Sequence, residues 1–258
     1  MVPHKLTLQF CLFLFLFLVH SSAPGRQSSV LAQQRKAPAG GRLAIVVDER
    51  LAALRVTPEL NGSLIRRLSR GRLIAIRSAK TNRDGVTFFF VNVSTRTRGW
   101  IQRESVVSPS RSGDDLGLFR LIEQSHDFDR IARARIFLDH FRRSPLRPRV
   151  LLLLGDTAEA LAAKLTTQAQ RKLTTDLGDA PEFTYFLNYS GLDRYNRQGV
   201  NFTFNPTTKR LYYDGQVYRL LLRHHPNSPE AIQARQRLVE LSNLHKPPAI
   251  LYSQPQKR

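Results

Sequence analysis

The fold is decided by residues 73–91, which read LIAIRSAKTNRDGVTFFFV. Two apolar runs, 73–76 and 88–91, flank Asp84-Gly85, and glycine supplies the positive backbone dihedral that a tight hairpin requires. Turn signals rich in Gly, Pro, Asn and Ser bound further short β segments around this hairpin. Several short strands within about 60 residues indicate a small barrel. The predicted strands are 43–47, 53–56, 64–68, 72–77, 86–93 and 99–102.

Three motifs within residues 43–107 resemble those of the bacterial SH3-like family. Residues 54–58 (LRVTP) are similar to its opening Leu/Val-Arg-x-x-Pro motif, and residues 68–71 (LSRG) to its central Leu-x-x-Gly turn. Residues 99–101 (GWI) are similar to the closing Gly-Trp-Ile/Val motif. The resemblance implies an all-β SH3-like small barrel. Residues 88–90 are all Phe where the family usually has a Gly-Trp or Trp-Tyr pair, so the resemblance does not imply a ligand type.

The second half of the chain, residues 114–245, changes to a helical period. Apolar residues recur at helical spacing over 128–165, on either side of Ser144-Pro145. A similar unit lies over 217–241 around Ser228-Pro229. Both units resemble the tetratricopeptide-like helix pairs of envelope scaffold proteins, which implies a mainly α-helical domain. Two units do not make a regular array, so one single helical domain is the alternative.

An insert, residues 181–216, separates these two units and is rich in aromatic residues and asparagine. Its segments 202–204 and 211–213, with the turn Asn205-Pro206 between them, predict a β-hairpin. We expect the aromatic side chains of the insert to pack against the helices rather than to bind sugars or peptides.

Residues 1–32 have the features of a signal peptide. Lys5 precedes an apolar run from Leu6 to Val19 of about 14 residues, which suits a signal-peptide core and is short for a membrane span. Small residues predict cleavage after Ala32, and an uncleaved membrane anchor is the alternative. We therefore expect export to the periplasm or cell envelope.

The mature chain that this cleavage would produce has no cysteine, because Cys11 is the one cysteine of the sequence. Disulfides, thiol nucleophiles and thiolate metal sites are then excluded. Residues 33–41 are expected to form a flexible linker, and residues 246–258 a loose basic tail.

The chain carries 40 Lys and Arg against 20 Asp and Glu, a formal net charge of +20. Such an excess indicates an anionic partner. Export argues against nucleic acid and favours a cell-wall polymer or an envelope protein, with membrane association only peripheral. The alternative is that arginine occupies ordinary solvated faces. The candidate binding residues are Arg66, Arg67, Arg70, Arg72, Arg96, Arg98 and Trp100. Of these, we expect Trp100 to pack in the core rather than to serve as a platform for a ligand.

Motifs of catalysis are absent from the sequence: it has no Gly-x-Ser-x-Gly elbow, His-Glu-x-x-His helix, P-loop or dinucleotide fingerprint. Asp114-Asp115 is expected to cap a helix. His126, Asp127 and Asp129 are spaced like metal ligands, but we expect one of these carboxylates to cap the next helix instead.

No catalytic residue, metal or cofactor is therefore expected. The sequence favours an envelope binding or scaffold protein, in which the barrel binds a wall polymer or an extended peptide and the helices bind a protein partner. An envelope enzyme such as a cell-wall hydrolase and a structural assembly factor without wall affinity are the alternatives.

Overall fold

A computed structural model of the protein describes residues 38, 40–175 and 182–244. The predicted signal peptide with its cleavage after Ala32, most of the predicted linker, and the predicted tail 246–258 lie outside the described residues. Within those residues, no helix combines the length and the apolar character that a membrane crossing would need.

The first part of the described chain is a seven-stranded antiparallel sheet. Its strand order is β3-β2-β6-β5-β4-β1-β7, and the two edge strands β3 and β7 are not paired with each other, so the described strands do not form a closed barrel. A short 3₁₀ helix, Arg103–Ser105, precedes β7. The strands are β1 (Arg42–Val46), β2 (Ala53–Arg55), β3 (Leu64–Arg67), β4 (Leu73–Thr81), β5 (Thr87–Asn92), β6 (Arg98–Gln102) and β7 (Val106–Val107).

All six predicted strands are present, and the β4–β5 hairpin turns at Asp84-Gly85 as predicted. Gly85 has a φ of 79°, a conformation that side chains with a Cβ rarely adopt. The Asn82 side-chain oxygen accepts the backbone N–H of Val86 at 2.8 Å and closes the turn. The seventh strand, β7, was not predicted because two residues are too short to show a period.

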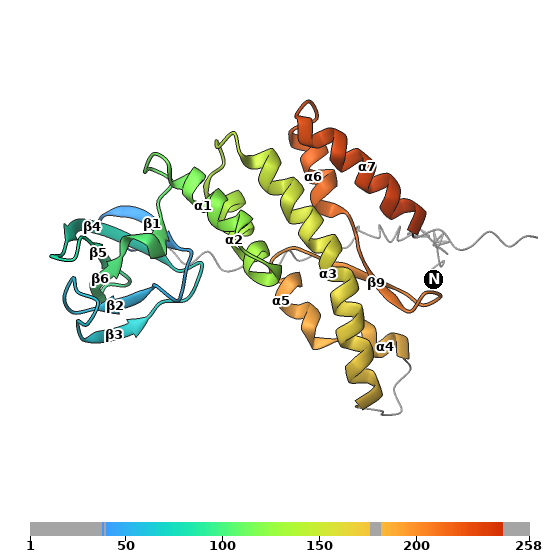
Figure 1. The fold of residues 1–258 in the computed structure, drawn as a ribbon, viewed down its shortest axis with the longest axis horizontal. Helices are drawn as coiled ribbons and strands as arrows, with labels where there is room; N and C mark the ends of the chain where they lie inside the picture. The colour runs from blue at the N-terminus through green and yellow to red at the C-terminus, as the bar shows by residue number, and fades with distance from the viewer. Residues whose placement is uncertain (1–37, 39, 176–181, 245–258) are drawn as a thin grey trace, which may run out of the picture. The chain divides into compact units, whose positions relative to one another are not determined.

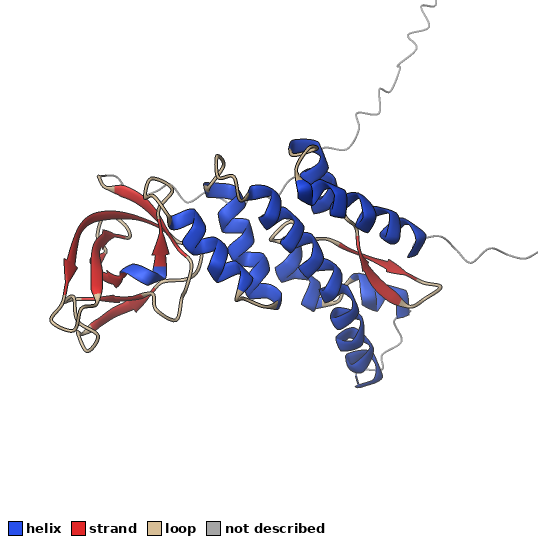
Figure 2. Cartoon of the chain, turned by 45° about the horizontal axis from the view of Figure 1, so that its top comes forward, coloured by secondary structure: helices blue, strands red, loops and turns tan. Residues whose placement is uncertain are grey.

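The second part is helical, with a two-stranded antiparallel ribbon inserted where a hairpin was predicted (Figures 1 and 2). The two predicted helix pairs correspond to α2 with α3 and to α6 with α7. A second 3₁₀ helix spans Ser190–Leu192. The elements are α1 (Asp114–Glu123), α2 (Asp127–His140), α3 (Arg147–Thr175), α4 (Glu182–Leu187), α5 (Asp193–Asn196), β8 (Phe202–Asn205), β9 (Arg210–Tyr213), α6 (Gln216–His224) and α7 (Pro229–Leu244).

Gly155 on α3 allows α6 to approach closely. A Cβ placed on this glycine would lie 2.3 Å from Cε1 of Tyr218, far inside van der Waals contact. Tyr218 is fully buried, and its hydroxyl donates a hydrogen bond to Asp156 at 2.7 Å. Helix packing therefore explains the glycine in the middle of this leucine-rich helix.

The sheet packs against the helices through β1, β7, α1 and α2. Ile45, Val47 and Val107 belong to the same buried apolar cluster as Leu118 and Ile131. A second apolar cluster lies within the sheet. The strands therefore contribute side chains to two cores, one internal and one shared with the helices.

Charged residues also connect the sheet to the helices, through hydrogen bonds and ion pairs. We call this group of residues the sheet–helix junction. Arg133 of α2 is only 3% exposed, and its guanidinium donates to the carbonyl of Val47 at 3.1 Å and to the hydroxyl of Ser125 at 2.6 Å. The third guanidinium nitrogen of Arg133, Nη2, lies 3.5 Å from a carboxylate oxygen of Asp48. The junction comprises Asp48, Arg70, Ser125, Asp129 and Arg133.

The predicted helix caps are present only in part. The residues that precede α1 and α2 form no side-chain cap, although Asp115 accepts the N–H of Leu116 in the first turn of α1 at 2.8 Å. Asp114 instead accepts hydrogen bonds from the backbone of Ser108 and the side chain of Arg111, both at 2.6 Å. Asp127 pairs with Lys164, and Asp129 pairs with Arg70 across the junction. The carboxylates pair with cations because the chain offers an excess of arginine.

The spacing of His126, Asp127 and Asp129 does not produce a metal site either. Among the residues that the structure describes, no group of three or more His, Cys, Asp or Glu side chains could hold a metal ion.

Candidate ligand-binding face of the sheet

The outer face of the sheet carries an aromatic pair at its centre. Phe90 of β5 and Trp100 of β6 are directly paired in the antiparallel register, and their rings lie 5.2 Å apart at 56°. Their chain neighbours Val91 and Ile101 are fully buried inside the sheet, and alternate residues of a strand point to opposite sides. Phe90 and Trp100 therefore face outward, where both are half-buried.

Strand register extends this pair into a row across four strands. Trp100 is paired with Arg55 of β2, and Phe90 is paired with Ser78 of β4. The Arg55 guanidinium donates to the carbonyl of Gly62 at 2.7 Å. We call this outward surface the Trp100 face, and it comprises Arg55, Ser78, Lys80, Phe90, Asn92, Arg98 and Trp100.

Gly99 brings β6 close to β2 directly behind the indole. A Cβ on this residue would lie 2.7 Å from the carbonyl oxygen of Arg55 and 3.0 Å from a side-chain carbon of Leu54. No side chain fits there. The glycine of the Gly-Trp motif thus lets the two strands pack closely, and the next residue presents its ring to the outside.

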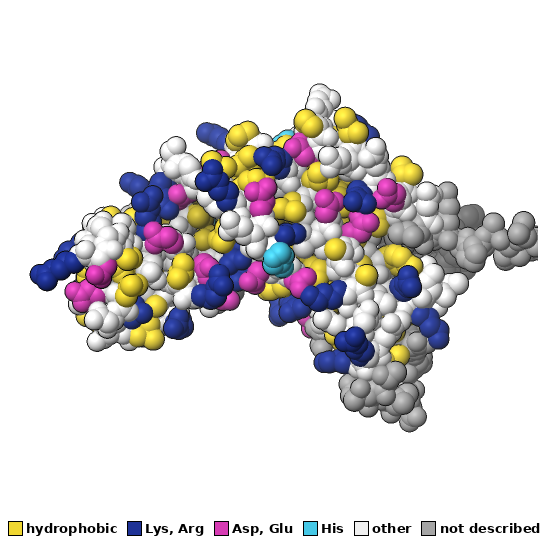
Figure 3. All heavy atoms as spheres, viewed as in Figure 1, with side chains coloured by type: hydrophobic (Ala, Val, Ile, Leu, Met, Phe, Trp, Pro, Cys, Tyr) yellow, Lys and Arg dark blue, Asp and Glu magenta, His cyan; other side chains and the backbone are white. Residues whose placement is uncertain are grey.

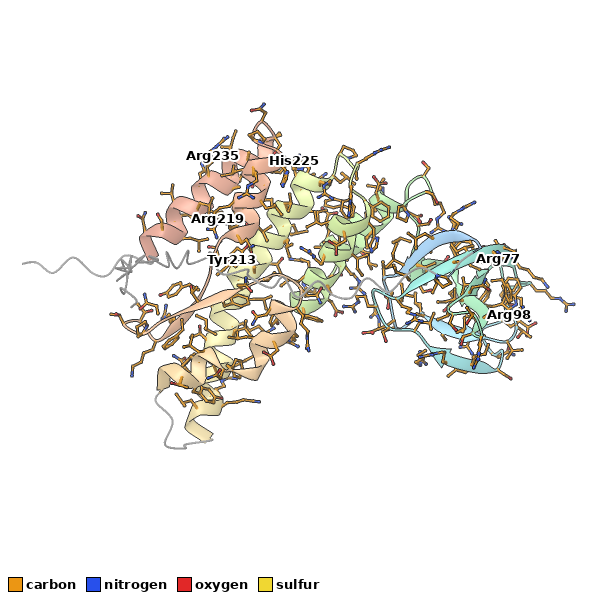
Figure 4. The ribbon with its side chains drawn as sticks, turned by 180° about the vertical axis from the view of Figure 1, so that it is seen from behind. Arg77, Arg98, Tyr213, Arg219, His225 and Arg235 are labelled. Atoms are coloured by element: carbon orange, nitrogen blue, oxygen red, sulfur yellow. The ribbon has the colours of Figure 1, made fainter. Side chains whose placement is uncertain are left out.

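Positive charge surrounds the aromatic pair without a matching carboxylate. Arg98 lies two residues before Trp100 and Lys80 two residues after Ser78, so both share the outward side of the sheet. Both are exposed, and neither forms an ion pair within the described chain. Figure 4 shows Arg98 on the outer side of the strands. The residues of the Trp100 face include no Asp or Glu.

Of the predicted binding residues, Arg98 and Trp100 lie together on this face. Arg70 does not: its side chain is 12% exposed and bonds Asp129 at 2.9 Å in the sheet–helix junction. Arg72 donates to the carbonyl of Val93 at 3.0 Å. The guanidinium groups of these two arginines are used in bonds within the protein, so they are not free to bind a ligand.

The remaining predicted arginines lie at other exposed positions. Arg66 and Arg67 are on the edge strand β3, where Arg67 donates to the carbonyl of Arg50 at 3.3 Å. Arg96 is in the loop between β5 and β6. The predicted basic rim therefore does not converge on one surface.

Sequence reasoning missed Arg55, Lys80 and Phe90 as members of the face. Each occupies an outward position of its own strand, a pattern that the period-two alternation contains. What the alternation cannot provide is the register between β2 and β6, which are far apart in the chain.

The chemistry available on the Trp100 face is recognition. An indole beside a phenyl ring provides a flat apolar platform, and guanidinium and ammonium groups pair with carboxylate or phosphate oxygens. The face holds no carboxylate, histidine or thiol that could transfer a proton or attack a substrate. It can bind an anionic molecule with an apolar or sugar-ring surface.

Comparison with known proteins adds no family assignment. The chain matches no protein-family model, no curated protein and no solved structure.

Proposed function

We propose that this chain is an exported binding protein of the cell envelope, whose sheet is an SH3-like domain that binds an anionic cell-wall polymer through the Trp100 face. The observation that carries the proposal is the Phe90–Trp100 pair flanked by cations that no carboxylate neutralises. Wall polymers offer both sugar rings and anionic groups, which suit this combination.

The three SH3-like motifs support the proposal through the roles that their residues have in the sheet. Arg55 and Trp100, from the opening and closing motifs, are neighbours on the Trp100 face. Gly71, from the central motif, has a φ of 76° at the turn into β4. Motifs distant in sequence thus contribute to one surface or to the turns that shape it.

We assign the helices, as tetratricopeptide-like pairs, to a protein partner. Ile232 and Val239 of α7 are 59% and 60% exposed, and their separation of seven residues places them on one side of the helix. Exposed apolar side chains in line on a helix suit contact with another protein.

The test is sedimentation of the mature protein with purified peptidoglycan over a salt series. We expect retention at low salt that weakens as salt screens the charges. Trp100→Ala and Arg98→Glu should each reduce retention several-fold, whereas Arg83→Glu, in the β4–β5 turn, should not. Absence of retention even at low salt, or an equal loss in all three variants, would refute wall binding by this face. Release of muropeptides by the purified protein would instead favour a hydrolase.

A further inference from the structure

Two loops lie beside the start of α1 and line an open hollow away from the Trp100 face. One loop, 109–113, leads into α1, and the other, 141–145, joins α2 to α3. The hydroxyl of Ser144 donates to the carboxylate of Asp115 at 2.7 Å, so the second loop is bonded to the start of α1. The hollow between them measures about 660 Å³, a volume that suits a small molecule.

Hydrogen-bond donors dominate the lining of this hollow. Ser110 and Ser112 line it from one loop, and Arg142 and Arg143 line it from the other. His140 also lines it. Burial, the largest effect, lowers the pKa of His140, so its ring is neutral near pH 7 and has one N–H to donate.

The start of α1 forms part of the same wall. Gly113 precedes the helix with a φ of 84° and provides no side-chain cap, and the N–H of Leu116 in the first turn donates to the Asp115 carboxylate at 2.8 Å. The positive end of the helix dipole favours an anion at this end. Asp115 is the one carboxylate in the lining, and the Ser144 hydroxyl already bonds it.

The free charge of the hollow is positive. Arg111 is neutralised by Asp114 at 2.6 Å, but neither Arg142 nor Arg143 has a carboxylate partner in the described chain. Burial and then the nearby charge of Arg142 lower the pKa of Arg147. Elsewhere, cations and carboxylates are interspersed over the visible face of the helices (Figure 3).

An alternative role for these cations is interaction with the carbonyl end of α2, which ends at His140. Arg147 already serves that end, because it donates to the carbonyls of Leu138 at 2.7 Å and Phe141 at 3.5 Å. Arg142 also contacts this end, since its Nε donates to the carbonyl of Asp139 at 3.4 Å. Arg143 has no such contact in the described chain, so the end of α2 leaves Arg143 unexplained.

We propose that this hollow binds a small molecule bearing a phosphate group, through Arg142, Arg143 and the serine hydroxyls of the 109–113 loop. Guanidinium groups pair with phosphate oxygens in a fork, and serine hydroxyls can donate to oxygens of the same group. The volume left beyond the anion accommodates the body of the molecule. The site is separate from the Trp100 face and does not depend on the function proposed for that face.

The experiment is calorimetric titration of the folded full chain with inorganic pyrophosphate at low salt. We expect Arg142→Ala/Arg143→Ala to weaken binding at least about tenfold, because it removes both free cations from the lining. The matched control Arg83→Ala/Arg210→Ala removes two exposed arginines in two other hairpins and should change binding less than about twofold. Circular dichroism confirms that each variant is folded.

Three further measurements keep the outcome decisive. Citrate, an equally charged carboxylate probe, should bind more weakly than pyrophosphate, and equal binding would overturn the phosphate assignment. Trp100→Ala should bind pyrophosphate normally even if it loses wall affinity, which separates this site from the proposed function. No binding by the wild type, or equal weakening by the matched control, would overturn the site.

Discussion

The sheet–helix junction and the Trp100 face use the same kinds of residue for different purposes. In the junction, Arg133 is 3% exposed and contacts a carbonyl, a hydroxyl and a carboxylate. On the Trp100 face, Arg98 is exposed and has no carboxylate partner in the described chain. The difference shows that the role of an arginine in a basic protein depends on the residues around it. The excess of positive charge alone does not assign a role to any arginine.

Desolvation explains why the junction arginines must be paired. Burial lowers the pKa of Arg133, since removing a cation from water disfavours its charged form. Asp48 and Asp129 offset part of this cost. On the Trp100 face water solvates the cations, so they need no internal partner and are available to a ligand. The following substitutions test this contrast through the free energy of unfolding.

Arg133→Met should have the largest effect and lower the free energy of unfolding by about 3 kcal/mol, because it removes three contacts at a buried site and leaves Asp48 with one fewer partner. Urea denaturation measures the change. The matched control Arg98→Met should change stability by less than about 0.5 kcal/mol. A loss equally small for Arg133→Met would show that the junction charge is not structural.

Asp48→Asn should come next and make the stability less dependent on pH. Hydrogen bonding from Arg50 lowers the pKa of Asp48 below its ordinary value of 3.8, although burial opposes this. The ionised carboxylate therefore stabilises the fold above pH 3.8, and that stability is lost as pH falls through the lower folded-state pKa.

Urea denaturation between pH 7 and pH 3 checks this prediction. We expect Asp48→Asn to cost about 1–2 kcal/mol at pH 7 and to decline less steeply in acid than the wild type. A variant that follows the wild-type profile in parallel would contradict a role for this carboxylate.

Arg70→Ala should have a smaller effect, about 1 kcal/mol, because Asp129 is half exposed and the ion pair is partly screened. A double-mutant cycle with Asp129→Ala isolates the pair, and we expect a coupling energy below about 1 kcal/mol that decreases in high salt. A coupling energy that does not change with salt would show that the Arg70–Asp129 pair behaves as a buried ion pair.

Arg98→Ala should have the smallest effect on stability, within about 0.5 kcal/mol, while it reduces retention on peptidoglycan. Thermal unfolding and sedimentation measure the two quantities on one preparation. If the free energy of unfolding falls by more than about 1 kcal/mol, Arg98 stabilises the fold. Its role would then not differ from that of the junction arginines.

Local patterns were enough to predict most elements. Alternating apolar residues and Asp84-Gly85 placed the β4–β5 hairpin, and helical spacing on both sides of Ser144-Pro145 and Ser228-Pro229 placed two helix pairs. The helix caps could not be predicted in the same way. Asp114, Asp127 and Asp129 have the composition of caps, but arginine and lysine side chains compete for their carboxylates.

The candidate site could be predicted only in part. Arg98 and Trp100 lie on one strand, so their shared outward direction follows from the alternation of a β-strand. That Arg70 and Arg72 are used internally, and that Arg55 and Phe90 flank the indole, depends on contacts between segments distant in the chain.

The sequence by itself determined the types of element and their order, because strand and helix periods and turn chemistry are local properties of the chain. It also determined a large positive charge. Only the tertiary structure decided which cations are buried and paired and which remain in solvent, because burial and pairing depend on strand register and on the packing of α2 against β1. The local sequence specifies neither of these.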